Sequence, residues 1–326
     1  MRILMFGRGV IATIYGWALE AAGHEIEFYV RPGRARAYGD AIDLDVVDTR
    51  MRRRGRHVAQ KWPVRFRETL EPDHDFDLIV LSVAHNRLPE AAKFLGPRLG
   101  DATVLVLGNI WSEPETALRP VPVDRLAWAA PQAGGGFAKS GLLRGMLLPS
   151  VIFGTLERPA TERETAVRSV FRDAGFRIRE EPDIRGWLWI HFAADAGMHS
   201  RGLRVGSLSK LKGSRAGFRQ ALLTTRELLP LLEARGVDLR RHRRSTLLFR
   251  APSALTSSVL AWVTAHIPAA GRSLDAHDDP DAEEPRAVCR DVLEEAHRLG
   301  VPAPRLEAAR ALWTADGAVD AAAEGR

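Results

Sequence analysis

A short glycine-containing motif near the amino terminus has the spacing of a phosphate-binding turn. It consists of six consecutive residues: Gly7, Arg8, Gly9, Val10, Ile11 and Ala12. The first glycine permits a tight turn, the second lets the backbone approach a pyrophosphate, and the small third residue lets a helix pack close to its strand. Backbone N–H groups at the start of that helix then attract the phosphates. Because the motif lies between an apolar segment at 2–6 and an amphipathic one at 10–22, it predicts a dinucleotide site rather than a glycine turn without a ligand.

The residues that follow the second predicted strand distinguish between dinucleotides. Segment 25–30 leads directly into Arg31, Pro32, Gly33 and Arg34. NAD-dependent enzymes often carry an acid here that binds the ribose 2′-hydroxyl, whereas guanidinium groups suit a 2′-phosphate. This sequence has the arginines and lacks the acid, so it predicts NADP(H) bound by Arg31 and Arg34. The alternative is that these arginines, Arg34 above all, are only exposed to solvent.

Three polar side chains in the second half of the chain have the spacing of one helix face. His191, Asp195 and His199 stand at positions i, i+4 and i+8 within an apolar segment. A His–Asp pair at this spacing can hold an imidazolium, which could protonate a developing alkoxide. The alternative is a purely structural pair. No metal site is predicted, because the two histidines are about 12 Å apart by helix rise and no cysteine cluster accompanies them.

Alternating strand and helix signals in the first half predict the scaffold for these residues. Strands are expected at 2–6, 25–30, 78–83, 103–107, 126–129 and 150–154, and helices at 10–22 and 89–95. This alternation is typical of an α/β, doubly wound Rossmann-type domain, although antiparallel pairing is an alternative within 126–156. Past about residue 180 the signals are helical: 187–200, 216–234, 253–265, 283–299 and 305–314. We therefore predict a Rossmann domain at 1–181 and an all-helical domain at 182–326.

Composition excludes several classes of protein. No apolar run reaches the ~18 residues of a membrane span, the first residues do not form a secretory signal, and a single cysteine, Cys289, rules out an intrachain disulfide. A cytoplasmic enzyme is the simplest interpretation. The net charge is +6, with a run of arginine at 52–54 and an arginine-rich run, interrupted by His242, at 240–244. Nucleic-acid binding is an alternative, but no nucleic-acid module accompanies these runs, so a basic surface that suits anionic ligands is favoured.

With these motifs the chain resembles the ketopantoate reductase (2-dehydropantoate 2-reductase) family. The resemblance extends to about residue 311 and includes further landmarks: residues 77–83, the turn 107–109, Trp189, and Glu284 upstream of 300–304. It implies a Rossmann domain, a helical second domain of the 6-phosphogluconate dehydrogenase C-terminal type, and a cleft between them. It also implies NADPH-dependent reduction of a 2-keto acid, as in pantothenate biosynthesis, and a possible homodimer.

The resemblance assigns roles to three further residues. Asn109 matches a family asparagine near the nicotinamide and substrate, where its amide could hydrogen-bond either. Glu284 matches a glutamate that binds the hydroxyl group of the substrate. Ser273 matches a nearby substrate-binding serine when a gap of one residue is allowed.

The departures from the family pattern concern the catalytic positions. His191 stands where the family has a lysine that acts as the general acid, and Ala84 replaces a second family lysine. Asp195 and His199 occupy positions that are usually asparagine. We therefore predict that His191 donates the proton, that Asp195 orients it, and that His199 faces the substrate. A small-molecule keto acid, ketone or imine other than ketopantoate is expected as substrate. The alternatives are true ketopantoate reduction using His191, and an inactive NADP(H)-binding sensor.

Overall fold

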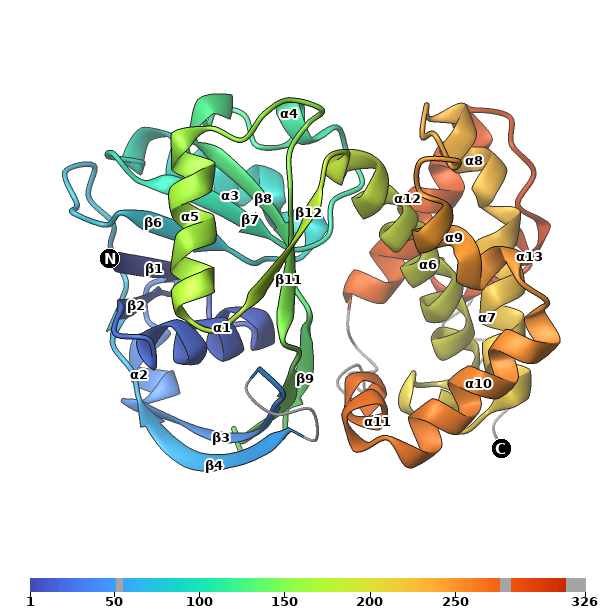
Figure 1. The fold of residues 1–326 in the computed structure, drawn as a ribbon, viewed down its shortest axis with the longest axis horizontal. Helices are drawn as coiled ribbons and strands as arrows, with labels where there is room; N and C mark the ends of the chain where they lie inside the picture. The colour runs from blue at the N-terminus through green and yellow to red at the C-terminus, as the bar shows by residue number, and fades with distance from the viewer. Residues whose placement is uncertain (51–54, 276–282, 315–326) are drawn as a thin grey trace. The chain divides into compact units, whose positions relative to one another are not determined.

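The computed structural model describes residues 1–50, 55–275 and 283–314 and divides into two compact units (Figure 1). The first unit is Met1–Arg185 and the second is Gly186–Arg326. The division expected from the sequence, between residues 181 and 182, coincides with the end of the last strand, β12 (Arg177–Glu181). Among the described residues, no helix is both long and apolar enough to cross a membrane.

An eight-stranded sheet forms the centre of the first unit. Its order is β12-β11-β8-β7-β6-β1-β2-β5, and all neighbouring pairs are parallel except β8 with β11. The remaining strands are β1 (Arg2–Phe6), β2 (Glu25–Tyr29), β5 (Phe66–Arg67), β6 (Leu78–Leu81), β7 (Thr103–Leu107), β8 (Leu126–Ala130) and β11 (Ser150–Gly154). The central strands are continuous apolar runs because helices or the second sheet cover them. The doubly wound α/β prediction is confirmed, as is antiparallel pairing within 126–156.

Helices cover both faces of this sheet. They are α1 (Val10–Glu20), α2 (Ala35–Tyr38), α3 (Leu88–Leu95), α4 (Pro114–Ala117) and α5 (Glu162–Asp173). Helices α1 and α5 share one core with the sheet, in which Ile14 and Phe171 are fully buried, and α3 lies on the opposite face (Figure 1). This arrangement brings the start of α1 to the carboxyl ends of β1 and β2.

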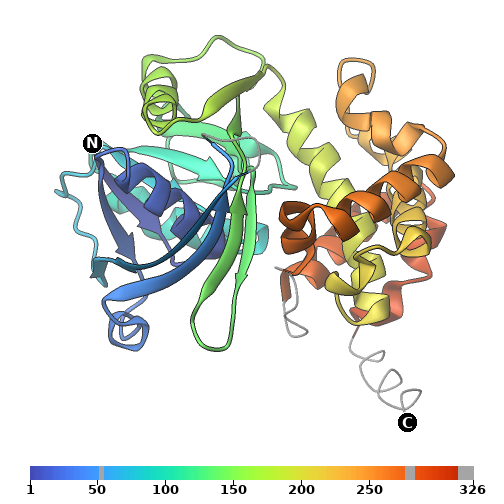
Figure 2. The ribbon, with the colours of Figure 1, turned by 60° about the horizontal axis from the view of Figure 1, so that its bottom comes forward.

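A second sheet, which the sequence analysis did not predict, lies against α1. Its order is β4-β3-β10-β9: β3 (Ala41–Asp48), β4 (Arg56–Pro63), β9 (Ala133–Phe137) and β10 (Leu143–Leu147). Strand β10 pairs with β3 in parallel and with β9 in an antiparallel hairpin, as Figure 2 shows for the green and blue strands. Glycines permit the close approach, because a Cβ on Gly145 would lie 2.8 Å from Ile14 Cδ1 and one on Gly135 would lie 2.4 Å from the Arg144 carbonyl oxygen.

The second unit is helical, as predicted, but several helix bounds differ from those expected. Its helices are α6 (Ile184–Val205), α7 (Arg215–Glu227), α8 (Leu229–Ala234), α9 (Arg243–Arg250), α10 (Ser253–His266), α11 (Pro268–Asp275), α12 (Glu283–Arg298) and α13 (Pro304–Glu307). The helix expected at 216–234 is two helices, since Pro230 begins a new one. The helix expected at 305–314 was too long. The α-helix α13 forms there, followed by a short 3-10 helix at Arg310–Leu312. Glu227 caps α13 by accepting hydrogen bonds from the backbone N–H groups of Arg305 and Leu306 at 2.8 and 2.9 Å.

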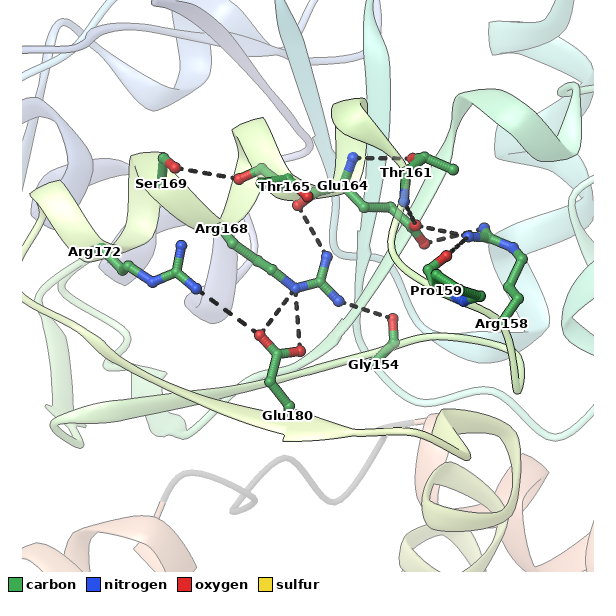
Figure 3. A network of polar contacts seen from close by, with 10 residues as sticks. All are labelled: Gly154, Arg158, Pro159, Thr161, Glu164, Thr165, Arg168, Ser169, Arg172 and Glu180. Atoms are coloured by element: carbon green, nitrogen blue, oxygen red, sulfur yellow. Dashed lines mark hydrogen bonds and ion pairs between the residues drawn. The ribbon is translucent and has the colours of Figure 1, made fainter.

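A capping box fixes the start of α5 (Figure 3). The Thr161 hydroxyl oxygen accepts from the Glu164 N–H at 3.2 Å, and the Glu164 carboxylate accepts from the Thr161 N–H at 2.7 Å. Arg158 pairs with the same buried carboxylate at 2.8 Å. Further along the helix, Arg168 reaches Glu180 of β12 at 3.2 Å. The network thus joins α5 to the edge of the sheet.

Replacement of Thr161 by alanine is expected to lower the free energy of unfolding by about 1 kcal/mol, because the helix loses its capping hydroxyl. Urea unfolding followed by circular dichroism measures the change. Ser169→Ala is the matched control, since it removes an exposed hydroxyl from the middle of the same helix. Equal effects of the two substitutions would contradict the role of the cap.

Candidate functional site

The predicted glycine motif forms a tight turn between β1 and α1. Gly7 has φ +95°, a left-handed conformation that favours glycine. Its N–H donates to the carbonyl oxygen of Tyr29 at 2.9 Å, which ties the turn to the end of β2. Gly9 is the N-cap of α1, and among the described residues no side chain caps it. The N–H groups of the first turn therefore remain for an anionic ligand.

A cavity of about 460 Å³ opens beside this turn. Gly7, Arg8 and Gly9 line it from one side, and Arg31 and Arg34 line it from the loop after β2. Other lining residues come from the ends of β1, β2 and β6, from α2, and from the segment around α3: Phe6, Tyr29, Val30, Tyr38, Val83, Arg87, Glu90, Ala91 and Phe94. The structure thus brings together the glycine turn and both predicted arginines.

Arg8 holds its guanidinium between two aromatic rings. The guanidinium carbon is 4.7 Å from the centre of the Tyr38 ring and 4.4 Å from that of Phe137. Desolvation lowers the pKa of Arg8, and its buried Nε has no hydrogen-bond partner in the described part of the chain. A desolvated cation with an unused donor suits an anion. Together with the uncapped α1 and the arginine-lined cavity, this fits the phosphate groups of a dinucleotide.

The acidic side chain in the cavity wall has a cationic neighbour. Glu90 lies 3.6 Å from the Arg87 guanidinium in an i,i+3 ion pair. Rings of Tyr29 and Phe94 meet at 4.8 Å between centroids and form an apolar part of the wall. No local motif in the sequence marks Arg87, Glu90 and Phe94 as site residues. Only the packing of α3 against the sheet brings them to the cavity.

Asn109 lies at the carboxyl end of the sheet but outside this cavity. It follows β7 and Gly108, and its side chain is half-buried. Ligands of open α/β sheets bind at this edge. As far as the described residues go, Asn109 is not part of the cavity lining that includes Arg31. Its predicted contact with nicotinamide or substrate therefore stays a prediction.

The three polar residues of the second unit all lie on α6. His191 Nε2 is 3.7 Å from Asp195 Oδ2, an ion-pair distance rather than a hydrogen bond. The His191 ring stacks on Trp187 with centroids 5.2 Å apart and an interplanar angle of 20°. The side chain of His191 is 45% exposed, whereas that of Asp195 is 23% exposed. His191 is thus solvent-accessible, stacks on an indole ring and lies within ion-pair distance of an acid.

The other predicted substrate residues have different surroundings. His199 is buried, one further helical turn along α6. Glu284 is exposed in the first turn of α12, and Ser273 lies within α11, with its side chain outside the described ones. Cys289 of α12 donates to the Ala196 carbonyl oxygen at 3.6 Å, and burial together with nearby Asp195 raises the pKa of its thiol. This contact fixes α12 beside the helix that carries His191.

A metal site is not found at these positions. Within 1–50, 55–275 and 283–314, no group of three His, Cys, Asp or Glu side chains could hold a metal ion.

The fold and the glycine turn define the class of protein: a Rossmann-type α/β unit followed by a helical unit. Residues 3–130 match the family model described as ketopantoate reductase PanE/ApbA. The family match covers this segment alone, and the chain as a whole has the fold of solved ketopantoate reductases. Comparison with curated protein sequences gives no match.

Several solved structures share this fold over nearly the whole length of the chain. The 2-dehydropantoate 2-reductase from Geobacter metallireducens is 17% identical with a TM-score of 0.68, over 96% of this chain and 99% of that one. D-mandelate dehydrogenase, in a ternary structure with NADH and anilino(oxo)acetate, is 14% identical with a TM-score of 0.69, over 98% and 99%. A dimeric ketopantoate reductase from Staphylococcus aureus is 13% identical with a TM-score of 0.65, over 98% and 100%.

Proposed function

We propose that the chain is an NADP(H)-dependent oxidoreductase of the ketopantoate reductase type that reduces the carbonyl of a 2-keto acid or a related ketone or imine. The observation that carries this proposal is the cavity beside the glycine turn, which Arg31 and Arg34 line. No acid stands between Tyr29 and Arg34 in the sequence. Two guanidinium groups at this place favour a 2′-phosphate over a ribose hydroxyl.

Each predicted residue has a defined task in this proposal. The bound nicotinamide supplies a hydride to the carbonyl carbon. The N–H groups at the start of α1, with Arg8, hold the diphosphate, and Arg31 and Arg34 hold the 2′-phosphate. His191 donates a proton to the carbonyl oxygen, and the carboxylate of Asp195 stabilises the imidazolium before transfer.

The remaining site residues bind the substrate in this proposal. The Asn109 amide donates a hydrogen bond to a substrate oxygen. Contacts from His199, Ser273 and Glu284 recognise the rest of the substrate. Two positions where the family has lysine are occupied by His191 and Ala84, and this favours a substrate other than ketopantoate. The same replacement also supports a second candidate, a protein that binds NADP(H) without catalysis and acts as a sensor.

Parallel binding and turnover measurements test these functions. NADPH fluorescence is expected to report tighter binding than NADH, and NADPH oxidation is expected with at least one member of a panel of 2-keto acids, ketones and imines. Ketopantoate is included in the panel, since its turnover would identify a true 2-dehydropantoate 2-reductase. Binding without any turnover would favour the sensor, and absence of binding to either dinucleotide would refute the proposal.

A further inference from the structure

The loop that carries Arg31 and Arg34 has little internal support. Gly33 has φ +81°, and the N–H of Arg34 donates to the Arg31 carbonyl oxygen at 3.1 Å, which forms a turn. The helix that follows, α2, has only four residues. Its N-cap is Arg34, whose own side chain makes no capping hydrogen bond. A single helical turn without a cap is not stable by itself.

Glu68 supplies the missing cap from a distant part of the chain. Its Oε1 accepts a hydrogen bond from the Ala35 N–H at 2.8 Å. This N–H, with those of Gly33 and Arg34, lowers the pKa of Glu68, which favours its charged form. An anion at the start of a helix is also favoured by the helix dipole.

The position of Glu68 is itself fixed by the sheet. It directly follows β5, whose residues Phe66 and Arg67 pair with Phe28 and Tyr29 of β2. Arg67 Nε also donates to the Glu27 carboxylate of β2 at 2.9 Å. Glu68 is therefore held at the edge of the sheet, and its hydrogen bond to Ala35 connects that edge to the loop that lines the cavity.

We propose that Glu68 is a positioning residue that sets the preference for a 2′-phosphate by holding the Arg31–Arg34 loop. The inference rests on the proposed function. In the described part of the chain, Glu68 is not among the residues that line the cavity, so it acts through the loop backbone. Preorganised arginines bind a phosphate at a lower cost in conformational entropy.

Electrostatic repulsion and helix capping predict opposite changes in NADPH affinity when Glu68 is removed. A carboxylate close to a phosphate site repels the phosphate, and its removal would by charge alone tighten NADPH binding. Loss of a helix cap instead loosens the loop and weakens that binding. Weaker NADPH binding in Glu68→Ala therefore supports positioning of the loop, whereas tighter binding supports electrostatic repulsion alone.

The test compares the dissociation constants of NADPH and NADH for the full chain and its variants. For Glu68→Ala we expect about a fivefold loss of NADPH affinity, the value of a typical cap, and less than about a twofold change for NADH. Glu68→Gln keeps an oxygen acceptor and is expected to restore the NADPH/NADH ratio to within about twofold of wild type. Glu71→Ala, which removes an exposed acid three residues further along the chain, is the control and is expected to leave the ratio unchanged.

Several outcomes would overturn the inference. An unchanged ratio or tighter NADPH binding in Glu68→Ala refutes positioning, and equal weakening of both dinucleotides refutes a role in selectivity. A thermal unfolding midpoint measured for each variant shows that the fold is intact, and Glu68→Gln provides the test if Glu68→Ala does not fold. A wild-type chain without preference for NADPH refutes the proposed function itself, and the inference falls with it.

Discussion

Replacement of His191 by glutamine is expected to lower kcat for carbonyl reduction about 10²- to 10⁴-fold, because glutamine cannot supply the proton that a general acid provides. NADPH affinity is expected to stay unchanged, since His191 belongs to the helical unit and not to the arginine-lined cavity. Steady-state kinetics with the best substrate of the panel measures the change in kcat, and fluorescence titration with NADPH measures the affinity.

The chain contains a matched control for this substitution. His266 stacks on Trp262 with centroids 5.1 Å apart and an angle of 19°, nearly the geometry of His191 on Trp187. His266→Gln therefore removes an exposed, indole-stacked histidine from another helix of the same unit. It is expected to leave kcat unchanged. Near wild-type turnover in His191→Gln, or an equal loss in both variants, would exclude His191 as the proton donor.

Replacement of Arg31 by alanine is expected to weaken NADPH binding about 10- to 100-fold and to change NADH binding little. This loss of NADPH affinity corresponds to the loss of charge-assisted hydrogen bonds to a phosphate, which are worth about 1.5–3 kcal/mol. NADH lacks the 2′-phosphate, so it does not experience this loss. Fluorescence titration with both dinucleotides measures the ratio directly.

Arg36→Ala is the control for the Arg31 substitution. Arg36 is an exposed arginine on α2, close in sequence to the loop, and it does not belong to the described cavity lining. The Arg36→Ala substitution removes the same formal charge as Arg31→Ala, from a position five residues further along the chain. If both variants weaken NADPH binding equally, general electrostatic attraction and not a specific contact explains the preference. If neither does, the 2′-phosphate site lies elsewhere.

The main sheet and the glycine turn follow from local patterns in the sequence. Apolar runs such as residues 2–6 are strands because both faces are buried, and Gly7 and Gly9 mark the turn by their backbone requirements. Strand β3 also carried a usable signal, since Ile42, Leu44 and Val46 alternate with less buried residues.

Other elements could not be predicted from local patterns. Strand β9 consists of Ala-Gly-Gly-Gly-Phe, a composition typical of turns, and it forms a strand only because β10 pairs with it. The cap that Glu68 gives to Ala35 joins residues 33 positions apart. The part of the cavity wall that α3 contributes also depends on contacts between segments that are distant in the sequence. Tertiary packing, not sequence motif, determines these parts of the site.

The second sheet has a consequence for how the chain is synthesised and folds. Strand β3 pairs with β10 in a register that joins Leu44 to Leu143, and Arg50 donates to the carbonyl oxygen of Ala174 at 2.7 Å. A nascent chain that ends at residue 130, the last one matched by the family model, has an unpaired β3 edge. Such long-range pairing is slow to form. The edge of β3 therefore stays open until β10 has left the ribosome, and during that time it can pair with other chains. The first unit completes its main sheet later, when β12 pairs with β11.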